Sequence, residues 1–307
     1  MMRVYFALIT WAALLLSSVQ ASSDCGGTFT LWQLPGQSGS QMNSYVLQTS
    51  GGQIIVVDGG YKIDADYLKD FLKARGNHVA MWFISHTHSD HVDALTAILK
   101  DPGQLKIDRI YASLLDDDWM REHGLVEENE PKTLAEFKEA ARAAHQRITE
   151  LQLGQVLRID GLTIEILGVK NPEIVENGVN NSSVVMRVWD HYKSVLFLGD
   201  LGVEGGEKIL HSEYRDRLKS DYVQMAHHGQ NGVDKAFYRA VAPKYCLWPT
   251  PKWLWDNDMG GGPGTGPWVT QEVRNWMDEL GVKKHYRQFD GMQIIQCNPT
   301  DDGNDKK

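Results

Sequence analysis

Short apolar runs alternate with amphipathic segments along this chain, and this alternation restricts the fold more than any other feature. Residues 54–57 and 79–84 are continuous apolar runs bounded by turn residues, which is typical of fully buried strands. Residues 63–75 and 131–151 carry apolar side chains at helical spacing. More short strands follow, with a predicted hairpin at 190–193. Because no linker interrupts the pattern, it predicts a single α/β domain with two sheets between helices.

The N-terminal 21 residues have a different composition from the rest. Arg3 supplies a positive charge, and residues 4–16 are apolar apart from Thr10. Val19 and Ala21 stand at the −3 and −1 positions of a cleavage site after Ala21. The pattern predicts a secretory signal peptide and a secreted, periplasmic or extracellular protein, because the run is short for a membrane span.

The remaining chain is predicted to form one domain over residues 22–297, followed by a polar, disordered tail over 298–307. No segment of this mature chain is apolar enough to span a membrane. An exported protein permits one disulfide among its three cysteines. Cys25 and Cys297 flank the folded region and could join its ends, although whether they pair stays open, and Cys246 is predicted to be a buried free thiol.

The formal net charge of −9 argues against a general nucleic-acid coat protein, which would need a basic face. It does not exclude an enzyme that holds phosphate through a metal ion. The hydrophobic content of 42% is that of an ordinary globular protein, which excludes a disordered chain.

Three histidines and an aspartate lie within six residues, in the polar segment after the buried run 79–84. They are His86, His88, Asp90 and His91. In an extended segment His86 and His88 point the same way, and the next two follow as the chain turns into a helix. Imidazoles and carboxylates suit Zn²⁺, Mn²⁺ or iron. Two such clusters can hold two ions roughly 3.5–4 Å apart, and the spacing argues against a chance histidine-rich loop.

The segment His86-Thr87-His88-Ser89-Asp90-His91 resembles the His-x-His-x-Asp-His signature of the metallo-β-lactamase-fold hydrolases. Weaker matches follow in the family's order over residues 28–297, among them Gly199-Asp200. Asn180-Asn181 and His227-His228-Gly229 resemble one branch in particular. That branch contains the hydrolase domain of the DNA-uptake competence protein ComEC and the choline-phosphate esterases. The resemblance implies an α/β fold of the four-layer αββα type.

The resemblance also implies a role for each matched residue. One or two Zn²⁺ ions are expected, with Mn²⁺ as the alternative. The predicted metal ligands are His86, His88 and His227 for the first ion, Asp90 and His91 for the second, and Asp200 for both.

The choice between His227 and His228 and the role of Asp58 each have an alternative. His227 and His228 are adjacent at a predicted strand end, so they point different ways, and strand alternation favours His227 as the ligand. Asp58 follows a buried strand and is predicted to orient a ligand histidine. A turn cap is the ordinary alternative for an aspartate in that place.

The chain departs from the family pattern at two places. Asn180 or Asn181 stands where many members have a histidine, and residues 252–267 lack the late histidine that many members carry. The second metal is therefore expected to have one protein ligand fewer or to be weakly held. Asn180, Asn181 and His228 are predicted to contact substrate.

The implied reaction is metal-assisted hydrolysis, in which an activated water attacks phosphorus or a carbonyl. Asp90 would position that water or relay its proton. The branch resemblance favours a phosphodiester: a nucleic acid, a nucleotide or a choline-phosphate ester, without a stable nucleic-acid complex. The alternatives are a thioester, lactone or β-lactam hydrolase, and a non-catalytic binding protein with a degraded metal site. The oligomeric state stays open.

Four tryptophans lie in or beside one glycine- and proline-rich stretch: Trp248, Trp253, Trp255 and Trp268. The stretch is expected near the metals, where Trp253 and Trp255 would grip a base, a sugar or a quaternary ammonium. Packing of the loop onto the domain is an equally good interpretation.

Charged runs elsewhere receive ordinary interpretations. The acidic runs 116–118 and 127–130 are predicted to be solvated loops. The basic cluster 283–287 could meet a phosphate, but a basic surface turn is the simpler interpretation. Isolated histidines such as His285 are assigned to surface or packing roles.

Overall fold

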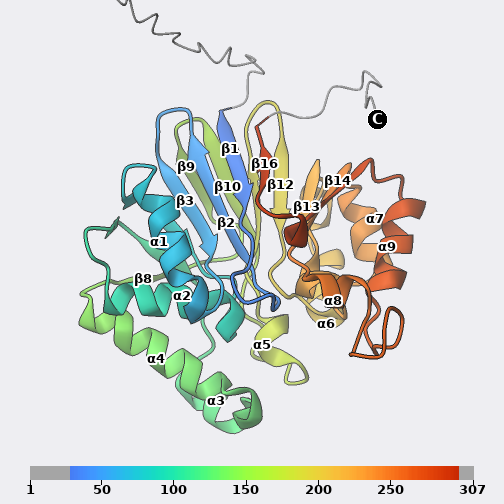
Figure 1. Ribbon diagram of the computed structural model, residues 1–307, viewed down its shortest axis with the longest axis horizontal. Helices are drawn as coiled ribbons and strands as arrows, with labels where there is room; N and C mark the ends of the chain where they lie inside the picture. The colour runs from blue at the N-terminus through green and yellow to red at the C-terminus, as the bar shows by residue number, and fades with distance from the viewer. Residues whose placement is uncertain (1–27, 297–307) are drawn as a thin grey trace, which may run out of the picture.

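The computed structural model describes residues 28–296 (Figure 1). The predicted signal peptide and the C-terminal tail lie outside the described residues and stay predictions. Cys25 and Cys297 also lie outside them, and their pairing stays open. Cys246 is buried and free, as predicted.

Two seven-stranded mixed sheets form the centre of the molecule (Figure 1). A short parallel pair, β4 (His78–Val79) with β6 (Lys106–Ile107), forms a separate two-stranded sheet next to β3. The first sheet has the order β16 (Gln293–Ile295), β1 (Phe29–Gln33), β2 (Ser44–Thr49), β3 (Ile54–Asp58), β5 (Met81–Phe83), β7 (Ile110–Ala112), β8 (Ile148–Glu150). The second has the order β15 (Lys284–Arg287), β14 (Tyr245–Trp248), β13 (Tyr222–Gln224), β12 (Ser194–Phe197), β11 (Val185–Trp189), β10 (Leu162–Gly168), β9 (Val156–Ile159).

Helices cover the outer face of each sheet (Figure 1). Three short helices lie at the lower end of the molecule in this view: α3 (Asp117–His123), α5 (Gly178–Asn181) and α8 (Lys252–Trp255). The first sheet is covered by α1 (Ala65–Lys73), α2 (Ser89–Lys100) and α4 (Glu130–Ala143), and the second by α6 (Val203–Leu210), α7 (Lys235–Val241) and α9 (Thr270–Glu279).

Three apolar cores separate the four layers. One lies between the first sheet and its helices, one between the two sheets, and one between the second sheet and its helices. Strand β3 shows why its sequence is continuously apolar: Val56 packs on the helix side, and Ile55 and Val57 pack between the sheets. A strand covered on both faces needs apolar residues at every position. The predicted αββα sandwich is therefore confirmed.

The predicted helix over 131–151 is wrong in its last third. Helix α4 ends at Ala143, and His145 has the left-handed φ of 54°, which ends the helical path. Residues 148–150 instead form β8, which pairs in parallel with β7. Sheet pairing thus overrides the helical spacing, as tertiary contacts often do. The hairpin predicted at 190–193 is confirmed, because β11 and β12 pair antiparallel around it.

The acidic run 116–118 is also different from the prediction of a solvated loop. The Asp116 carboxylate accepts a hydrogen bond from the Trp119 backbone N–H at 2.8 Å and so caps α3. An aspartate at this position satisfies an N–H that the helix itself cannot pair.

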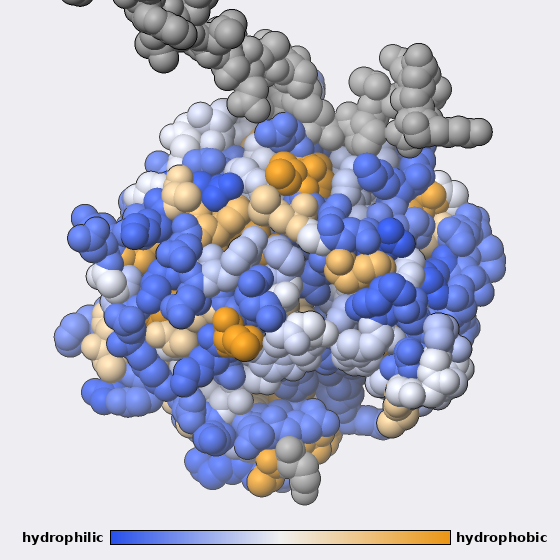
Figure 2. All heavy atoms as spheres, viewed as in Figure 1, coloured by the Kyte–Doolittle hydropathy of each residue, from blue (hydrophilic) through white to orange (hydrophobic). Residues whose placement is uncertain are grey.

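The face of the molecule in Figure 2 is largely hydrophilic, with apolar side chains in small separate groups. Over residues 28–296, no helix has the length and hydrophobicity that a membrane span requires.

Candidate metal centre

The predicted metal-binding residues follow three strands, β5, β12 and β13. Strands β3 and β5 are parallel neighbours in one sheet, and β12 and β13 are parallel neighbours in the other. The carboxyl ends of parallel strands meet at one edge, so side chains that follow them converge. His86 and His88 follow β5, Asp200 follows β12, and the two histidines 227 and 228 follow β13.

Six side chains at this edge fall into two groups that share one member. In each group, one potential ligand atom per residue lies within 4.8 Å of the others. The shared member is Asp200, which is where a bridging carboxylate would stand. The first group is His86, His88 and Asp200, and the second is Asp90, His91, Asp200 and His228.

Each histidine of the two groups has one ring nitrogen held by a neighbouring acceptor. His91 donates its Nδ1 proton to Asp58 Oδ2 at 2.8 Å, and His228 donates its Nδ1 proton to the Pro249 carbonyl at 2.9 Å. His88 uses its Nε2, which lies 2.8 Å from a carboxylate oxygen of Glu130.

His86 is held in the same way by two hydroxyls. Its Nδ1 lies 3.1 Å from Ser85 Oγ and 3.3 Å from Ser183 Oγ. Partners of this kind fix the tautomer and the ring direction of metal-binding histidines.

Several opposite atoms at this centre are buried and have no hydrogen-bond partner. They are the Nε2 atoms of His86, His91 and His228, together with Asp200 Oδ1. Their nearest polar neighbours are one another: His228 Nε2 lies 2.9 Å from Asp90 Oδ2, and His91 Nε2 lies 3.2 Å from Asp200 Oδ1. Buried polar atoms usually form hydrogen bonds, so this convergence is the arrangement expected of ligands that face a cation. Imidazole nitrogens and carboxylate oxygens that converge in this way fit divalent cations such as zinc or manganese.

The charges at the second group attract a cation. Burial would lower the pKa of His228, but Asp200 and Asp90 raise it to about 10. His91 follows the same pattern: against the effect of burial, Asp200, Asp90 and Asp58 hold its pKa well above the usual value. Three buried carboxylates thus surround these two imidazoles, and a divalent cation placed there would compensate their charge.

A left-handed turn determines which of the two adjacent histidines faces the second group. Strand β13 ends at Gln224, and His227, His228 and Gly229 all have positive φ, at 51°, 55° and 79°. Positive φ is costly for residues with a Cβ and tends to be retained at functional sites. The chain is not extended here, so strand alternation does not apply to it.

The turn buries His228 completely and leaves the His227 side chain 19% exposed. His228 Nε2 lies 2.9 Å from Asp90 Oδ2 and 3.3 Å from Asp200 Oδ2. His227 Nε2 lies 3.8 Å from Asp200 Oδ2 and belongs to neither group. The sequence interpretation made His227 a ligand of the first ion and His228 a substrate contact, whereas the geometry favours His228 as a ligand in the second group. With His228 in place, the second group has four side chains and does not lack the ligand that the sequence suggested.

The two asparagines before β11 have different surroundings. Asn181 is fully buried, and its amide bonds the Glu176 carbonyl, the Glu204 carboxylate and the Gly205 N–H. Asn180 donates its Nδ2 to Asn177 Oδ1 at 2.8 Å, while its Oδ1 is buried without a partner. Of these two asparagines, only Asn180 lines the cavity that lies beside the two groups of ligand side chains.

That cavity has a volume of about 400 Å³ and opens over the metal-binding side chains. Its lining includes Asp90, Asp200 and His227 together with Tyr61 and Leu125.

The predicted tryptophan wall lies elsewhere. Neither Trp253 nor Trp255 lines this cavity. Trp253 packs against Trp268, with ring centroids 4.9 Å apart, and donates its indole N–H to the Gly39 carbonyl. Trp255 packs edge-on against Trp248 at 5.1 Å. These contacts correspond to the packing interpretation of the tryptophans.

Sequence reasoning missed Glu130, which was assigned to a solvated acidic run. The residue is only 4% exposed. One carboxylate oxygen contacts His88 Nε2 at 2.8 Å, and the other accepts the Leu125 backbone N–H at 2.7 Å. Glu130 therefore connects a predicted metal ligand to the cavity wall. It lies 42 residues from His88 in the sequence, and no local spacing could reveal the contact.

We expect Glu130→Gln to weaken metal binding, because a glutamine can no longer offer an acceptor to both the His88 ring and the Leu125 N–H. Removal of such an outer partner typically lowers metal affinity roughly 10–100-fold. Competition of the metal-loaded protein with a chromogenic chelator measures the effect. Glu136→Gln is the control, since Glu136 is exposed on the same helix and belongs to neither group. Equal metal affinities of the two variants would remove the role assigned to Glu130.

Comparisons with known proteins agree with this geometry. Residues 38–244 match the metallo-beta-lactamase superfamily. No curated protein has a sequence similar enough to count as a relative. Among solved structures, the chain is similar to the metallo-beta-lactamase fold protein YhfI from Bacillus subtilis, with a TM-score of 0.53 and 14% identity over 87% of this chain and 99% of that one.

Two further structures are similar at lower scores. The CmlA beta-hydroxylase E377D mutant has a TM-score of 0.49 and 12% identity, over 87% of this chain and 54% of that one. A diphosphatase of the PhnP family has a TM-score of 0.47 and 12% identity, over 87% and 97%. The family match extends over more than half of the sequence and includes every residue of both metal-binding groups, so the chain belongs to the metallo-β-lactamase superfamily.

Proposed function

We propose that this protein is an exported hydrolase with two metal ions that cleaves phosphodiesters, and that it belongs to the branch containing ComEC-type hydrolase domains and choline-phosphate esterases. One observation carries the hydrolase proposal: two groups of ligand side chains share Asp200, and their facing atoms are buried and converge on one another. The phosphodiester and the branch rest on the sequence resemblance around Asn180-Asn181 and His227-His228. Export rests on the signal-peptide pattern.

In this proposal His86, His88 and Asp200 hold one ion, and Asp90, His91, Asp200 and His228 hold the other. When bound, divalent cations would supply Lewis acidity and lower the pKa of a coordinated water. The nitrogen-rich donor set favours zinc, and the carboxylates of the second group are also compatible with manganese.

The chain's own residues position the substrate. His227 lies at the edge of the second group and lines the cavity, so it can contact the substrate. Asn180 presents an oxygen, not an amide N–H, so it would accept a hydrogen bond from a substrate hydroxyl or a water. Asp58 orients His91 through its Nδ1 and does not face the cavity.

The alternatives remain two. The same centre would also polarise the carbonyl of a thioester, lactone or β-lactam. A non-catalytic protein with a degraded site is less consistent with the structure, because the second group has its full set of four side chains.

A substrate panel tests the proposal. The metal-loaded protein and His88→Ala are assayed with bis-p-nitrophenyl phosphate, p-nitrophenylphosphorylcholine, single-stranded DNA, a lactone and nitrocefin. We expect cleavage of at least one phosphodiester by the wild type and none by the variant. Cleavage of only the lactone or nitrocefin would contradict the phosphodiester proposal. No activity, with less than one tightly held metal ion per chain, would support the binding protein.

A further inference from the structure

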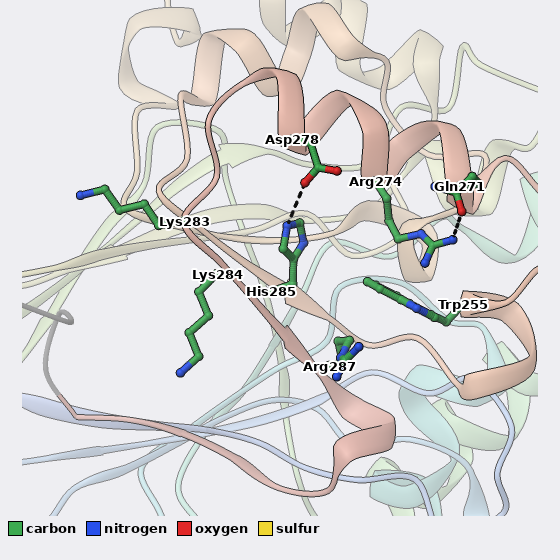
Figure 3. A pocket seen from close by; sticks show the side chains of 8 residues that line it. All are labelled: Trp255, Gln271, Arg274, Asp278, Lys283, Lys284, His285 and Arg287. Atoms are coloured by element: carbon green, nitrogen blue, oxygen red, sulfur yellow. Dashed lines mark hydrogen bonds and ion pairs between the residues drawn. The ribbon is translucent and has the colours of Figure 1, made fainter. Parts of the chain in front are cut away.

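A second cavity, of about 440 Å³, lies between α9 and β15 and is separate from the metal centre (Figure 3). None of the predicted metal ligands lines it. Its lining includes one acidic residue, Asp278, and five basic ones, Arg274, Lys283, Lys284, His285 and Arg287. Such a concentration of positive charge is unusual in a chain whose net charge is −9.

Two guanidinium groups are held next to the Trp255 ring. The Arg274 Cζ atom lies 4.3 Å from the ring centroid, and the Arg287 Cζ atom lies 5.4 Å from it. Figure 3 shows both arginines beside Trp255, with His285 between them and the two lysines. Because the aromatic ring fixes the guanidinium groups, little side-chain entropy remains to be lost when they bind a ligand.

The two arginines retain N–H donors for a ligand at this cavity. One nitrogen of the Arg274 guanidinium group donates to Gln271, which uses one of its five N–H donors. Arg287 donates its Nε to Asp290 at 2.7 Å, which uses one of its five N–H donors. Trp248 donates its indole N–H to His285 Nδ1 at 2.9 Å, so a neutral His285 carries its proton on Nε2.

The positive charges repel one another in the absence of a ligand. Burial lowers the pKa of Arg274, Asp256 and Asp278 oppose this effect, and Arg287 adds a smaller lowering effect. Burial, Arg274 and Arg287 likewise lower the pKa of His285 despite the nearby Asp278. A bound anion would relieve this repulsion.

We propose that this cavity binds a phosphate group through Arg274 and Arg287, independently of the metal ions. Two arginines present planar guanidinium groups whose N–H donors match the geometry of phosphate oxygens. A phosphate dianion compensates several positive charges better than the single negative charge of a carboxylate does. Lys283 and Lys284 also line the cavity, but their ammonium groups point away from the two arginines, so the proposed contacts are those of Arg274 and Arg287 (Figure 3). The group is either free phosphate or the terminal phosphate of an oligonucleotide. This site is additional to the proposed hydrolytic centre and does not depend on its function.

Calorimetric titration of the metal-loaded, full-length protein with inorganic phosphate tests the proposal. We expect binding to the wild type and at least about tenfold weaker binding to Arg274→Gln/Arg287→Gln, since each charge-assisted hydrogen bond to the anion is worth a factor of that order or more. Lys100→Gln/Arg142→Gln removes the same charge from α2 and α4 and should bind phosphate like the wild type. Thermal melting verifies that both double variants fold.

A third variant separates this site from the metal centre. Asp200→Ala should keep the phosphate binding that the arginine variant loses. The proposal is overturned if no phosphate binds, if both double variants bind like the wild type, or if only Asp200→Ala loses the binding.

Two oligonucleotides then distinguish the sources of the phosphate. They have the same sequence and carry either a 5′-phosphate or a 5′-hydroxyl. Tighter binding of the phosphorylated strand that depends on Arg274 and Arg287 identifies a strand end as the ligand. Equal binding of both strands, together with arginine-dependent binding of inorganic phosphate, identifies a free phosphate compound.

Discussion

Replacement of His228 by alanine should remove one metal ion and abolish hydrolysis, whereas His227→Ala should keep both ions. His228 Nε2 is buried and lies 2.9 Å from Asp90 Oδ2 and 3.3 Å from Asp200 Oδ2. Without this imidazole, two buried carboxylates lack the group that they face, and the second ion has one ligand fewer. The effect should exceed the roughly 10–100-fold that removal of an outer partner costs.

The adjacent histidine is a matched control, because both variants remove an imidazole from the same turn. Elemental analysis after dialysis measures the number of metal ions per chain, and kcat/KM measures the loss of hydrolysis. We expect His228→Ala to retain about one ion fewer per chain than the wild type, and His227→Ala to retain the full number with a lower kcat. The reverse outcome, in which only His227→Ala releases metal, would restore the assignment made from strand alternation.

The layers of the fold could be predicted because continuous apolar runs such as 54–57 are required wherever a strand is covered on both faces. The segment 86–91 could be interpreted because its ligands are close in sequence, so local geometry alone brings them together. The end of α4 could not be predicted in the same way. The helical spacing continues past Ala143, and only pairing with β7 makes residues 148–150 a strand.

The choice between adjacent residues depended on the backbone, which the residue types do not reveal. His227 and His228 both adopt positive φ, a conformation that no pattern of side chains in this segment predicts. The roles of Asn180 and Asn181 differ because only the Asn181 amide bonds Glu176, Glu204 and Gly205. These contacts are made only in the folded chain.

Groups that act from a distance were the hardest to predict. Glu130 is one acidic residue in an acidic run, and its burial against His88 follows from the packing of α4 beside α2. Trp255 was assigned to the metal face, but it holds Arg274 and Arg287 at the second cavity. In both cases the residue type was compatible with several roles, and a partner from a distant segment selected one.

Asp58 connects the fold to the metal centre, and its replacement should affect both. One carboxylate oxygen accepts the Ser85 N–H at 2.7 Å. The other accepts Asn43 Nδ2 at 2.7 Å, Ser85 Oγ at 2.8 Å and His91 Nδ1 at 2.8 Å. The residue is completely buried and has a left-handed φ of 56°, which aspartate and asparagine tolerate better than most residues.

Asp58→Asn therefore keeps the size and the backbone conformation but removes one acceptor. In either orientation its amide NH₂ meets a donor, either the Ser85 N–H or the group of donors that includes His91 Nδ1. If the NH₂ faces His91, the imidazole proton moves to Nε2, and the nitrogen that should bind metal is blocked. We expect metal affinity at the second group to fall by about 100-fold or more, at the upper end of the range for outer partners.

Asp58→Ala should in addition destabilise the metal-free protein by about 3–5 kcal/mol, because it leaves buried donors without an acceptor. Denaturant unfolding in the presence of a chelator measures this destabilisation separately from metal binding. Asp64→Asn is the control: Asp64 is also buried and accepts backbone N–H groups from Gln37 and Tyr61, but it belongs to neither metal-binding group. If Asp58→Asn held metal as tightly as Asp64→Asn does, Asp58 would be only a turn cap. Weakened metal binding in Asp58→Asn alone would establish that its carboxylate fixes the tautomer of His91.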